Sequence, residues 1–403
     1  MSKRKTPILR FKGFNNAWEQ RKLGDIAKIV GGGTPSTKNS QYWNGNINWY
    51  SPTEIGKNAF VNESKKKITK AGLQHSSAKL LLKNKTILFT SRANIGDLAI
   101  MTSDGATNQG FQSWVIDQLK IDIYFLYSLG NILKNQAIKL AYGSTFLEIS
   151  NKNVKNLQLK IPNIQEQKKI GSLFKIIDEL LTLQKRKYEE LKLIKKFLLQ
   201  NMFADKVPYP NLRFNNFTSE WKLQYLGKLF RRNNERNKKN IFKIDHTITV
   251  SKMKFNINGN GAAPTSICTY KVLRTGDVAF EGNRHTKYPF GQLIINDIGD
   301  GIMSPRFASI RPKYKLNISY WKYFLHYEPL VHNILVMSTK SGTLMNELVY
   351  SDLFKQNIFL PENSEQIKIG KILNIIDYKI NLQKRYILKL KSIKNFLLQN
   401  MFV

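Results

Sequence analysis

The side chains best suited to chemistry in this sequence are hydrogen-bonding and basic groups, gathered in short segments. Arg, Asn, Gln, Ser and Thr side chains on rigid supports read base edges in DNA grooves, and Lys and Arg also neutralise phosphates. Each of them could instead cap a turn or stay solvated. The residues predicted to contact DNA are Thr34, Ser36, Ser91, Arg92, Asn94, Gln109 and Gln112 in the first half, and Asn283, Arg284, Lys287, Ser304 and Arg306 in the second.

Motifs for catalysis and cofactor binding are missing from the sequence. The triple glycine Gly31–Gly33 lacks the spacing of a dinucleotide-binding loop, and no G-x-x-x-x-G-K-[ST] segment occurs. The five histidines show no H-E-x-x-H spacing, and the single Cys268 excludes a cysteine-rich zinc site. No paired carboxylates suggest metal-dependent phosphodiester cleavage. We therefore predict a binding protein with no catalytic residues, no metal and no cofactor of its own.

The net charge points to a polyanionic partner. The 403 residues include 64 Lys and Arg against 28 Asp and Glu, which gives a formal charge of +36. Such a surface repels itself unless an anion neutralises it, so nucleic acid is the first candidate. A membrane surface is the alternative, but its helices carry basic residues on one face, whereas here they spread along the chain. With no long apolar run and one cysteine, the predicted location is the cytoplasm.

Two segments of the chain occur twice. Residues 8–24 share Leu, Arg, Phe, Trp and Gly positions with residues 211–227. Residues 167–203 and 366–402 are identical at 22 of 37 positions. Between these repeats the sequences diverge. Because the period is near 200 residues, the pattern indicates duplication of a whole domain together with a helical segment, and not a solenoid.

The long repeats are predicted to be helices that form a coiled coil. A capping-box spacing, Asn163 with Glu166 and Asn363 with Gln366, marks each start. Apolar residues then recur at the two seam positions of a heptad. In both copies a Gln and a Lys occupy matched seam positions, where they either fix the register or, for the lysines, extend out of the seam. The predicted seam of the first copy is Ile170, Phe174, Ile177, Leu181, Gln184, Tyr188, Leu191, Lys195, Leu198 and Met202.

The segments between the helices read as mixed α/β. Strands are predicted at 46–55, 85–101, 110–117, 242–255, 270–280, 290–296 and 305–312, and helices at 121–142 and 318–337. The predicted fold class is α+β, with two mixed α/β domains separated by two long helices. Duplication favours antiparallel packing of those helices with an internal pseudo-twofold.

This arrangement resembles the specificity subunit of a type I restriction-modification system. The similarity covers essentially the whole chain. It is carried by GGGTPS at 31–36, LFTSRANIGDLAI at 88–100, TNQGFQ at 107–112 and the duplicated helix ending in FLLQNMF. The second variable domain lacks the GGTPS and TNQGFQ patterns. The resemblance implies target recognition domains at 1–160 and 207–360, with conserved helical spacers at 161–206 and 361–403.

The resemblance also implies partners. Each recognition domain would read one half of a bipartite, asymmetric DNA target, and the helices would dock two methyltransferase subunits for adenine methylation. Motor-nuclease subunits would join them for ATP-dependent cleavage, and S-adenosylmethionine, ATP and Mg²⁺ would belong to these partners. The predicted methyltransferase contacts are Tyr188, Leu193, Phe197, Leu199, Phe396 and Leu398.

Two other readings of the sequence stay open. A stand-alone DNA-binding regulator would show a short recognition helix after a turn, and none is evident. A purely structural coiled-coil adaptor would have no use for a charge of +36.

Overall fold

The computed structural model describes residues 6–92, 94–143, 147–259, 261 and 263–403. It divides into two compact units, Met1–Lys187 with Lys384–Val403, and Tyr188–Gln383. Each unit therefore combines one variable domain with one end of each long helix. The domain boundaries expected from the sequence follow chain order, and they stay predictions.

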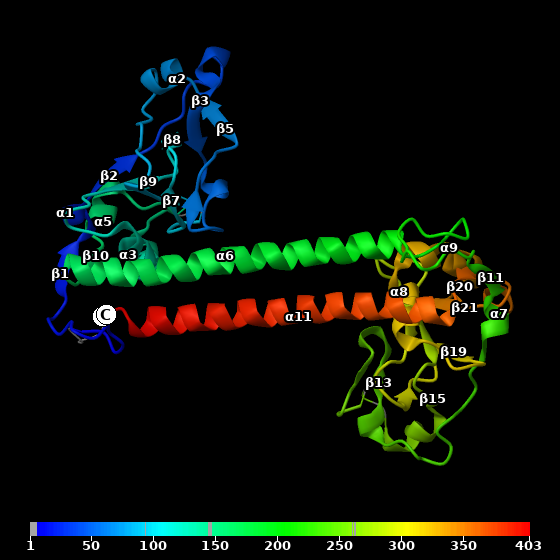
Figure 1. Cartoon of the computed structure of the whole chain (residues 1–403). Coiled ribbons are helices and arrows are strands. Elements are labelled where there is room, and N and C mark those ends of the chain that lie inside the picture. The colour runs from blue at the N-terminus through cyan, green and yellow to red at the C-terminus, as the bar shows by residue number, and fades with distance from the viewer. Residues whose placement is uncertain (1–5, 93, 144–146, 260, 262) are drawn as a thin grey trace. The chain divides into compact units, whose positions relative to one another are not determined.

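The main sheet of the first unit has the order β2-β9-β6-β7-β4. Three of its strands, β2, β7 and β9, are labelled in Figure 1. Its central strands are rich in buried aliphatic and aromatic side chains, and Phe89 stacks on Trp114 at the centre. A smaller sheet, β5-β3-β8, lies in the same unit. The strands are β2 (Ala27–Gly31), β3 (Trp43–Tyr50), β4 (Phe60–Val61), β5 (Lys66–Ile68), β6 (Thr86–Phe89), β7 (Leu98–Met101), β8 (Gly105–Thr107) and β9 (Gln112–Ile116).

The second unit repeats this plan with a shorter sheet. Its order, β12-β19-β16-β17, matches β2-β9-β6-β7 strand for strand. Two small two-stranded sheets, β13-β14 and β15-β18, accompany it. The strands are β12 (Phe230–Arg232), β13 (Ile248–Thr249), β14 (Lys254–Phe255), β15 (Lys271–Leu273), β16 (Val278–Glu281), β17 (Gln292–Ile295), β18 (Gly301–Met303) and β19 (Ala308–Pro312).

Short helices and strands connect each sheet to the long helices. In both units an antiparallel strand pair, β1-β10 or β11-β22, brings the start of the variable domain back to the start of a long helix. The remaining elements of the first unit are β1 (Glu19–Lys22), α1 (Leu23–Ile26), α2 (Lys70–Gln74), α3 (Ile123–Ser128), α4 (Gly130–Leu140), α5 (Asn151–Lys155) and β10 (Gln158–Ile161). Those of the second are β11 (Lys222–Tyr225), α7 (Leu226–Leu229), α8 (Ile318–His326), α9 (Glu328–Ser338), β20 (Thr339–Ser341), β21 (Asn346–Leu348), α10 (Tyr350–Leu353) and β22 (Asn357–Leu360).

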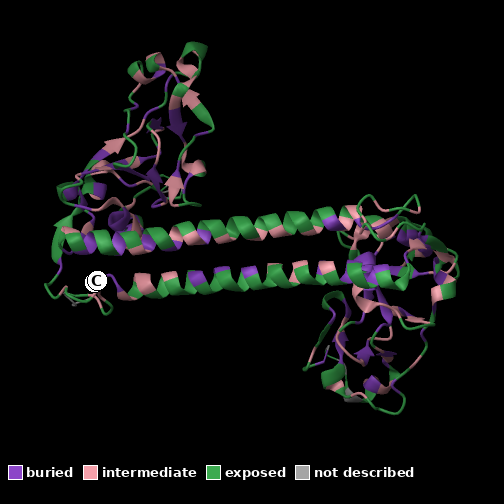
Figure 2. Cartoon of the chain, viewed as in Figure 1, coloured by how far each residue is buried: buried purple, intermediate pink, exposed green. Residues whose placement is uncertain are grey.

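The long helices are α6 (Ile164–Asn201) and α11 (Asn363–Asn400), and they pair within each unit. In the first unit Phe174 contacts Phe402, and one turn further along α6 Asp178 pairs with Lys394. As the residue number increases along α6, the residue number of its contact on or just beyond α11 decreases. The helices are therefore antiparallel, as predicted. Each predicted seam position is buried or half-buried, and Figure 2 shows this buried stripe along both helices.

The seam lysines form ion pairs, and so the structure decides between the two readings of them. Lys195 contacts Asp377 at 2.6 Å in the second unit, as Lys394 contacts Asp178 in the first. Each aspartate also accepts a tyrosine hydroxyl from the variable domain, Tyr124 on α3 at 2.8 Å and Tyr323 on α8 at 2.9 Å. Burial and the adjacent aspartate raise the pKa of both tyrosines, which therefore stay protonated donors. Each Tyr–Asp–Lys group thus joins both long helices to the variable domain of its unit.

A glycine in each long helix makes room for the variable domain. A Cβ at Gly171 would lie 2.2 Å from Asp122 Oδ1, the capping group of α3. A Cβ at Gly370 would lie 2.9 Å from the Tyr320 nitrogen of α8. Both glycines recur because the first turn of the shorter helix sits directly against the backbone of the longer one.

The repeated Leu-Arg-Phe segment is explained by an ion pair. Arg10 binds Glu166 through two contacts of 2.7 Å, and Arg213 binds Glu365 through two of 2.8 Å. Both carboxylates are buried at the first turn of a long helix. Bidentate pairing of this kind satisfies a carboxylate that would otherwise be isolated from water.

Four predictions from the sequence were wrong. The predicted strand 85–101 is two strands, β6 and β7, with a loop between them, and 270–280 likewise divides into β15 and most of β16. Residues 242–255 form short 3-10 turns and the brief pair β13-β14. Asn363 is the first residue of α11 and not its cap, because the backbone carbonyl of Glu362 accepts the first bonds. Asn163, by contrast, caps α6 through Glu166 N at 3.0 Å, as predicted.

Candidate nucleic-acid interface

In the first unit three loops meet at one edge of the main sheet. They are residues 31–36 after β2, 90–97 between β6 and β7, and 107–111 before β9. Backbone bonds join them, Gly33 N to Thr107 O and Ser91 N to Gly110 O, both 2.8 Å. A Cβ at Gly32 would lie 1.9 Å from Asn108 O, so the triple glycine permits this close approach of two backbones.

Six of the seven residues predicted to contact DNA in this half gather at that edge with exposed or half-buried side chains. Thr34 donates to Gln109 at 2.6 Å on the surface. Gln112 accepts from Asn151 at 2.8 Å. The others are Arg92, Asn94 and Ser36, all exposed.

The position of Arg92 decides how it could act. Its Nε lies 2.9 Å from the Glu148 carboxylate, and 47% of its side-chain surface is exposed to solvent. An exposed ion pair of this kind is weak, so a ligand phosphate or base edge can compete for the guanidinium.

The structure contradicts the prediction for Ser91. Its side chain is fully buried, and its hydroxyl has no hydrogen-bond partner among the described residues. Its backbone joins Gly110 and Ile149 across the edge. Ser91 therefore holds the loops together and does not reach a base.

In the second unit the corresponding edge carries the remaining predicted residues. Phe280 pairs with Ala308, so the β16–β17 loop and the β18–β19 loop lie side by side. The first loop holds Asn283, Arg284 and Lys287, and the second holds Ser304 and Arg306. Two of them donate hydrogen bonds, Arg284 to Gly342 O at 3.2 Å and Asn283 to Glu281. The cations of Lys287 and Arg306 lie over the rings of the residues that follow them, Tyr288 and Phe307.

Matching strand order reveals a correspondence that the sequence analysis missed. In both central pairs a β-branched residue lies opposite the matching strand, Ile87 opposite Trp114 and Val278 opposite Ile310. Counting from these pairs aligns Phe111-Gln112-Ser113 with Phe307-Ala308-Ser309. The serine hydroxyls of both segments are buried without a partner in the described part of the chain. The sequence contains this match as Phe-x-Ser in both halves. Two identical residues between otherwise divergent segments do not reveal the correspondence until the strands are aligned.

The second unit also contains charged residues that the sequence analysis missed. Arg311 binds Asp277 at 2.7 Å and Glu235 at 2.6 Å, and Arg274 binds Glu235 at 2.7 Å and Asp300 at 2.9 Å. Burial raises the pKa of Asp277 against the opposing effect of Arg311. Because all three acids form ion pairs with these two arginines, the network is structural. It connects the segments around β12, β15 and β19.

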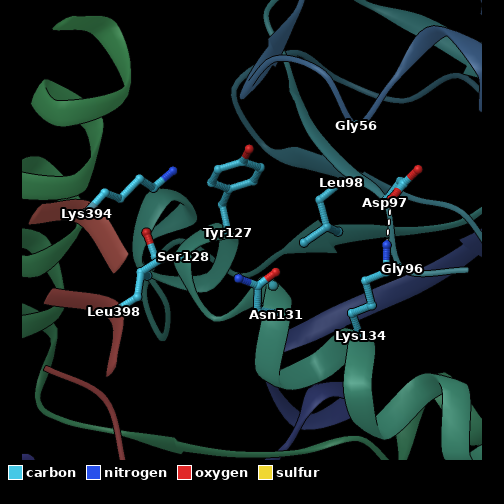
Figure 3. Close-up of a pocket in the computed structure, with 11 residues that line it drawn as sticks. Gly56, Gly96, Asp97, Leu98, Tyr127, Ser128, Asn131, Lys134, Lys394 and Leu398 are labelled. Carbon is cyan, nitrogen blue, oxygen red and sulfur yellow. Dashed lines mark hydrogen bonds and ion pairs between the residues drawn. The ribbon is translucent and has the colours of Figure 1, made fainter. Parts of the chain in front are cut away.

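A polar pocket in the first unit is also explained by internal pairing (Figure 3). Asp97 and Lys134 face each other at 2.8 Å, and Tyr127 and Lys394 line the opposite wall. Lys394 is engaged by Asp178. The cations of the pocket are thus already neutralised by aspartates of the same unit.

The described residues contain neither a candidate metal site nor a helix that could span a membrane. No group of three or more His, Cys, Asp or Glu side chains within them could hold a metal ion. Burial lowers the pKa of His326 to about 4, so this histidine is neutral. Along the same described ranges, no helix has both the length and the apolar character to cross a membrane.

The predicted partner contacts lie on the long helices with unequal exposure. Leu193, Phe197 and Phe396 are exposed by 66%, 55% and 57%. Tyr188 is half-buried in the seam. Leu199 and Leu398 are half-buried, because both pack partly against the cores of their units.

An exposed apolar face that the sequence analysis only partly identified flanks the seam. In the first unit it comprises Ile176, Leu183, Ile393 and Phe396, and in the second the equivalent Ile375, Leu382, Ile194 and Phe197. In heptad terms these positions lie on the flank opposite Gly171 and Asp178, where the variable domain docks. We call this set the flank patch of each unit.

Comparison with known proteins shows similarity to type I restriction-modification specificity subunits. The family described as type I restriction modification DNA specificity domain matches residues 15–193. The type I restriction enzyme MjaIX specificity subunit of Methanocaldococcus jannaschii is 25% identical over 94% of this chain and 91% of its own length. The chain is thus similar to type I restriction-modification specificity subunits. The EcoR124I/EcoR124II specificity subunit of Escherichia coli is 31% identical over 43% of both chains.

Solved structures of the family share the fold. The crystal structure of a type I restriction-modification system S subunit from M. genitalium matches with a TM-score of 0.62 over 99% of both chains, at 16% identity. A chain from a study of complex assembly and conformational transition in a type I system matches with a TM-score of 0.53 over 96% of this chain, at 17% identity. The fold class expected from the sequence, mixed α/β domains with long helices, is thereby confirmed.

Proposed function

We propose that this specificity subunit reads a bipartite, asymmetric DNA target, one half with each sheet edge. The observation that carries the proposal is the repetition of one scaffold with different side chains at its edge. Equivalent loops carry Thr34, Arg92 and Gln109 in one unit and Arg284, Lys287 and Arg306 in the other. Two unlike readers on one scaffold suit two unlike half-sites.

The proposal is tested by methylation mapping. The chain is expressed with its methyltransferase subunit in a host that lacks adenine methylation, and the modified adenines are sequenced. We expect one motif with two unlike halves around an unread gap. A single continuous motif, or sequence-independent methylation, would contradict the proposal.

Replacing Arg92 by Ala is expected to relax only the first half-site. A bidentate contact to a base contributes about 1–3 kcal/mol of discrimination, so one position should become degenerate. The measurement is the same methylation map. Glu148→Gln is the control, because it removes the surface partner and leaves the guanidinium. Uniform weakening at every site would instead make Arg92 a phosphate contact.

We further propose that the two flank patches dock two methyltransferase subunits, one per unit. Four exposed apolar side chains on one helical flank, repeated in both units, are unusual for a surface without a partner. Their duplication implies two equal sites. Adenine methylation requires the base to leave the stack, and that chemistry, with S-adenosylmethionine, would reside on these partners.

Loss of one patch should halve the partner content of the complex. Ile176→Asp with Phe396→Asp is expected to reduce the number of bound methyltransferase subunits from two to one, since buried charges oppose docking. Native mass spectrometry measures the stoichiometry. Lys175→Asp with Asn395→Asp is a control that changes adjacent exposed positions. Two bound subunits in the patch variant would disprove the assignment.

The chain itself is proposed to be non-catalytic and cytoplasmic. Motor-nuclease subunits carrying ATP and Mg²⁺ would complete the restriction complex. A purified chain that methylates or cleaves DNA unaided would contradict this part of the proposal. A regulator or an adaptor, the two alternatives from the sequence, would bind DNA or protein but produce no methylation map.

A further inference from the structure

Three cations converge beside the reading edge of the second unit. Arg232 ends β12, Arg236 lies in the loop that follows, and Lys271 begins β15. The backbones of Arg236 and Lys271 are joined by a β-bridge, and Arg236 donates to Thr269 O at 2.8 Å. Arg232 stacks over the Tyr350 ring at 4.8 Å.

Lys271 connects this cluster to the proposed reading loop. Its ammonium donates to Phe307 O at 2.5 Å, the carbonyl next to Arg306. Lys271 is half-buried, and the charged groups that face it are the guanidiniums of Arg236 and Arg232. Burial, followed by those two arginines, lowers the pKa of Lys271 to about 8.

No acid compensates these three charges within the described residues. Glu235, which precedes Arg236 in the sequence, and Asp277 are occupied by Arg274 and Arg311. A half-buried ammonium beside two guanidiniums is unfavourable by itself, and such arrangements are typical of sites that bind an anion.

We propose that Arg232, Arg236 and Lys271 form a phosphate clamp that grips the DNA backbone next to the second half-site. This inference rests on the proposed function, since it assigns a backbone contact to an edge that reads bases. Phosphate contacts fix the register of a protein on the duplex, and base contacts then specify sequence. The clamp holds the backbone while Arg306, one residue from the Phe307 carbonyl, faces the groove.

The clamp predicts proton uptake on binding. Near pH 8 the Lys271 amine of the free chain is only partly protonated, and a bound phosphate favours its protonated ammonium form. Affinity should therefore fall as pH rises through 8, by about tenfold between pH 7 and pH 9. In the Lys271→Arg variant, whose guanidinium stays charged, the decrease should disappear.

The test measures the dissociation constant of the full chain for a target duplex and for a scrambled duplex, across salt and pH. Arg236→Gln and Lys271→Gln are each expected to weaken both duplexes about five- to tenfold and to lower the salt slope by about one. Arg236 is exposed, so its variant tests the clamp even if Lys271→Gln does not fold. Lys315→Gln is the matched control, because Lys315 is exposed beyond the opposite end of β19.

The outcomes separate this inference from the proposed function. Unchanged affinity, salt slope and pH profile in the Arg236 and Lys271 variants of a chain that still prefers its target would overturn the clamp alone. Weakening of the target but not of the scrambled duplex would also overturn it, because the cluster would then read bases. A wild-type chain that binds both duplexes equally would contradict the proposed function itself.

Discussion

Lengthening both long helices by one heptad is expected to widen the unread gap by about three base pairs, because seven helical residues add about 10.5 Å. The variant duplicates Gln184–Glu190 in α6 and Gln383–Lys389 in α11. These segments lie where the chain passes between the compact units. Both half-sites should be unchanged, because neither sheet edge is altered. Methylation mapping measures the gap.

The duplication has to be made in both helices. Asp178 pairs with Lys394 in one unit and Lys195 with Asp377 in the other, so α6 and α11 must have equal lengths between these pairs. Insertion in α6 alone would displace one pair and leave an aspartate and a tyrosine hydroxyl without their partner. We expect that single insertion to abolish methylation. An unchanged gap in the double variant would disprove the helix pair as the spacer.

Replacing Phe402 by Ala is expected to destabilise the first unit by about 3–5 kcal/mol, the usual effect of removing a buried phenyl ring. Phe402 is next to last in the chain, yet its ring contacts Trp18, Phe125 and Phe174. The C-terminus thus completes the core of the N-terminal domain, and Leu9 N bonds Asn400 O at 2.8 Å. Hydrogen exchange should show loss of protection in β6 and β9.

The duplication supplies a matched variant for this prediction. Phe203 is the repeat equivalent of Phe402, and its ring contacts Tyr320 and Phe324 in the second unit. Phe203→Ala should therefore expose β16 and β19 and leave β6 protected. Phe396→Ala is the control, because that ring is exposed. Equal loss of protection in both units from either variant would show that the units do not fold separately.

The framework could be read from the sequence, because it depends on local periodicity and on repetition. Heptad spacing gave the seam, and identity between residues 167–203 and 366–402 gave the pairing of two like helices. The polar edge residues were predictable because glycine- and asparagine-rich turns separate the strands. Ser91 was the exception, since an exposed and a buried serine look alike in a turn.

The tertiary structure alone decided which distant residues meet. Arg10 with Glu166, and Lys195 with Asp377, are contacts across more than 150 positions, and no periodicity announces them. The cation cluster of Arg232, Arg236 and Lys271 depends on the pairing of β12 with β19 and on the β-bridge between Arg236 and Lys271, in a domain whose loops diverge from the first. Local pattern determines which elements form, because it sets backbone conformation and the apolar face. Which charges become neighbours depends on long-range strand order, and that is fixed only when the sheets pack.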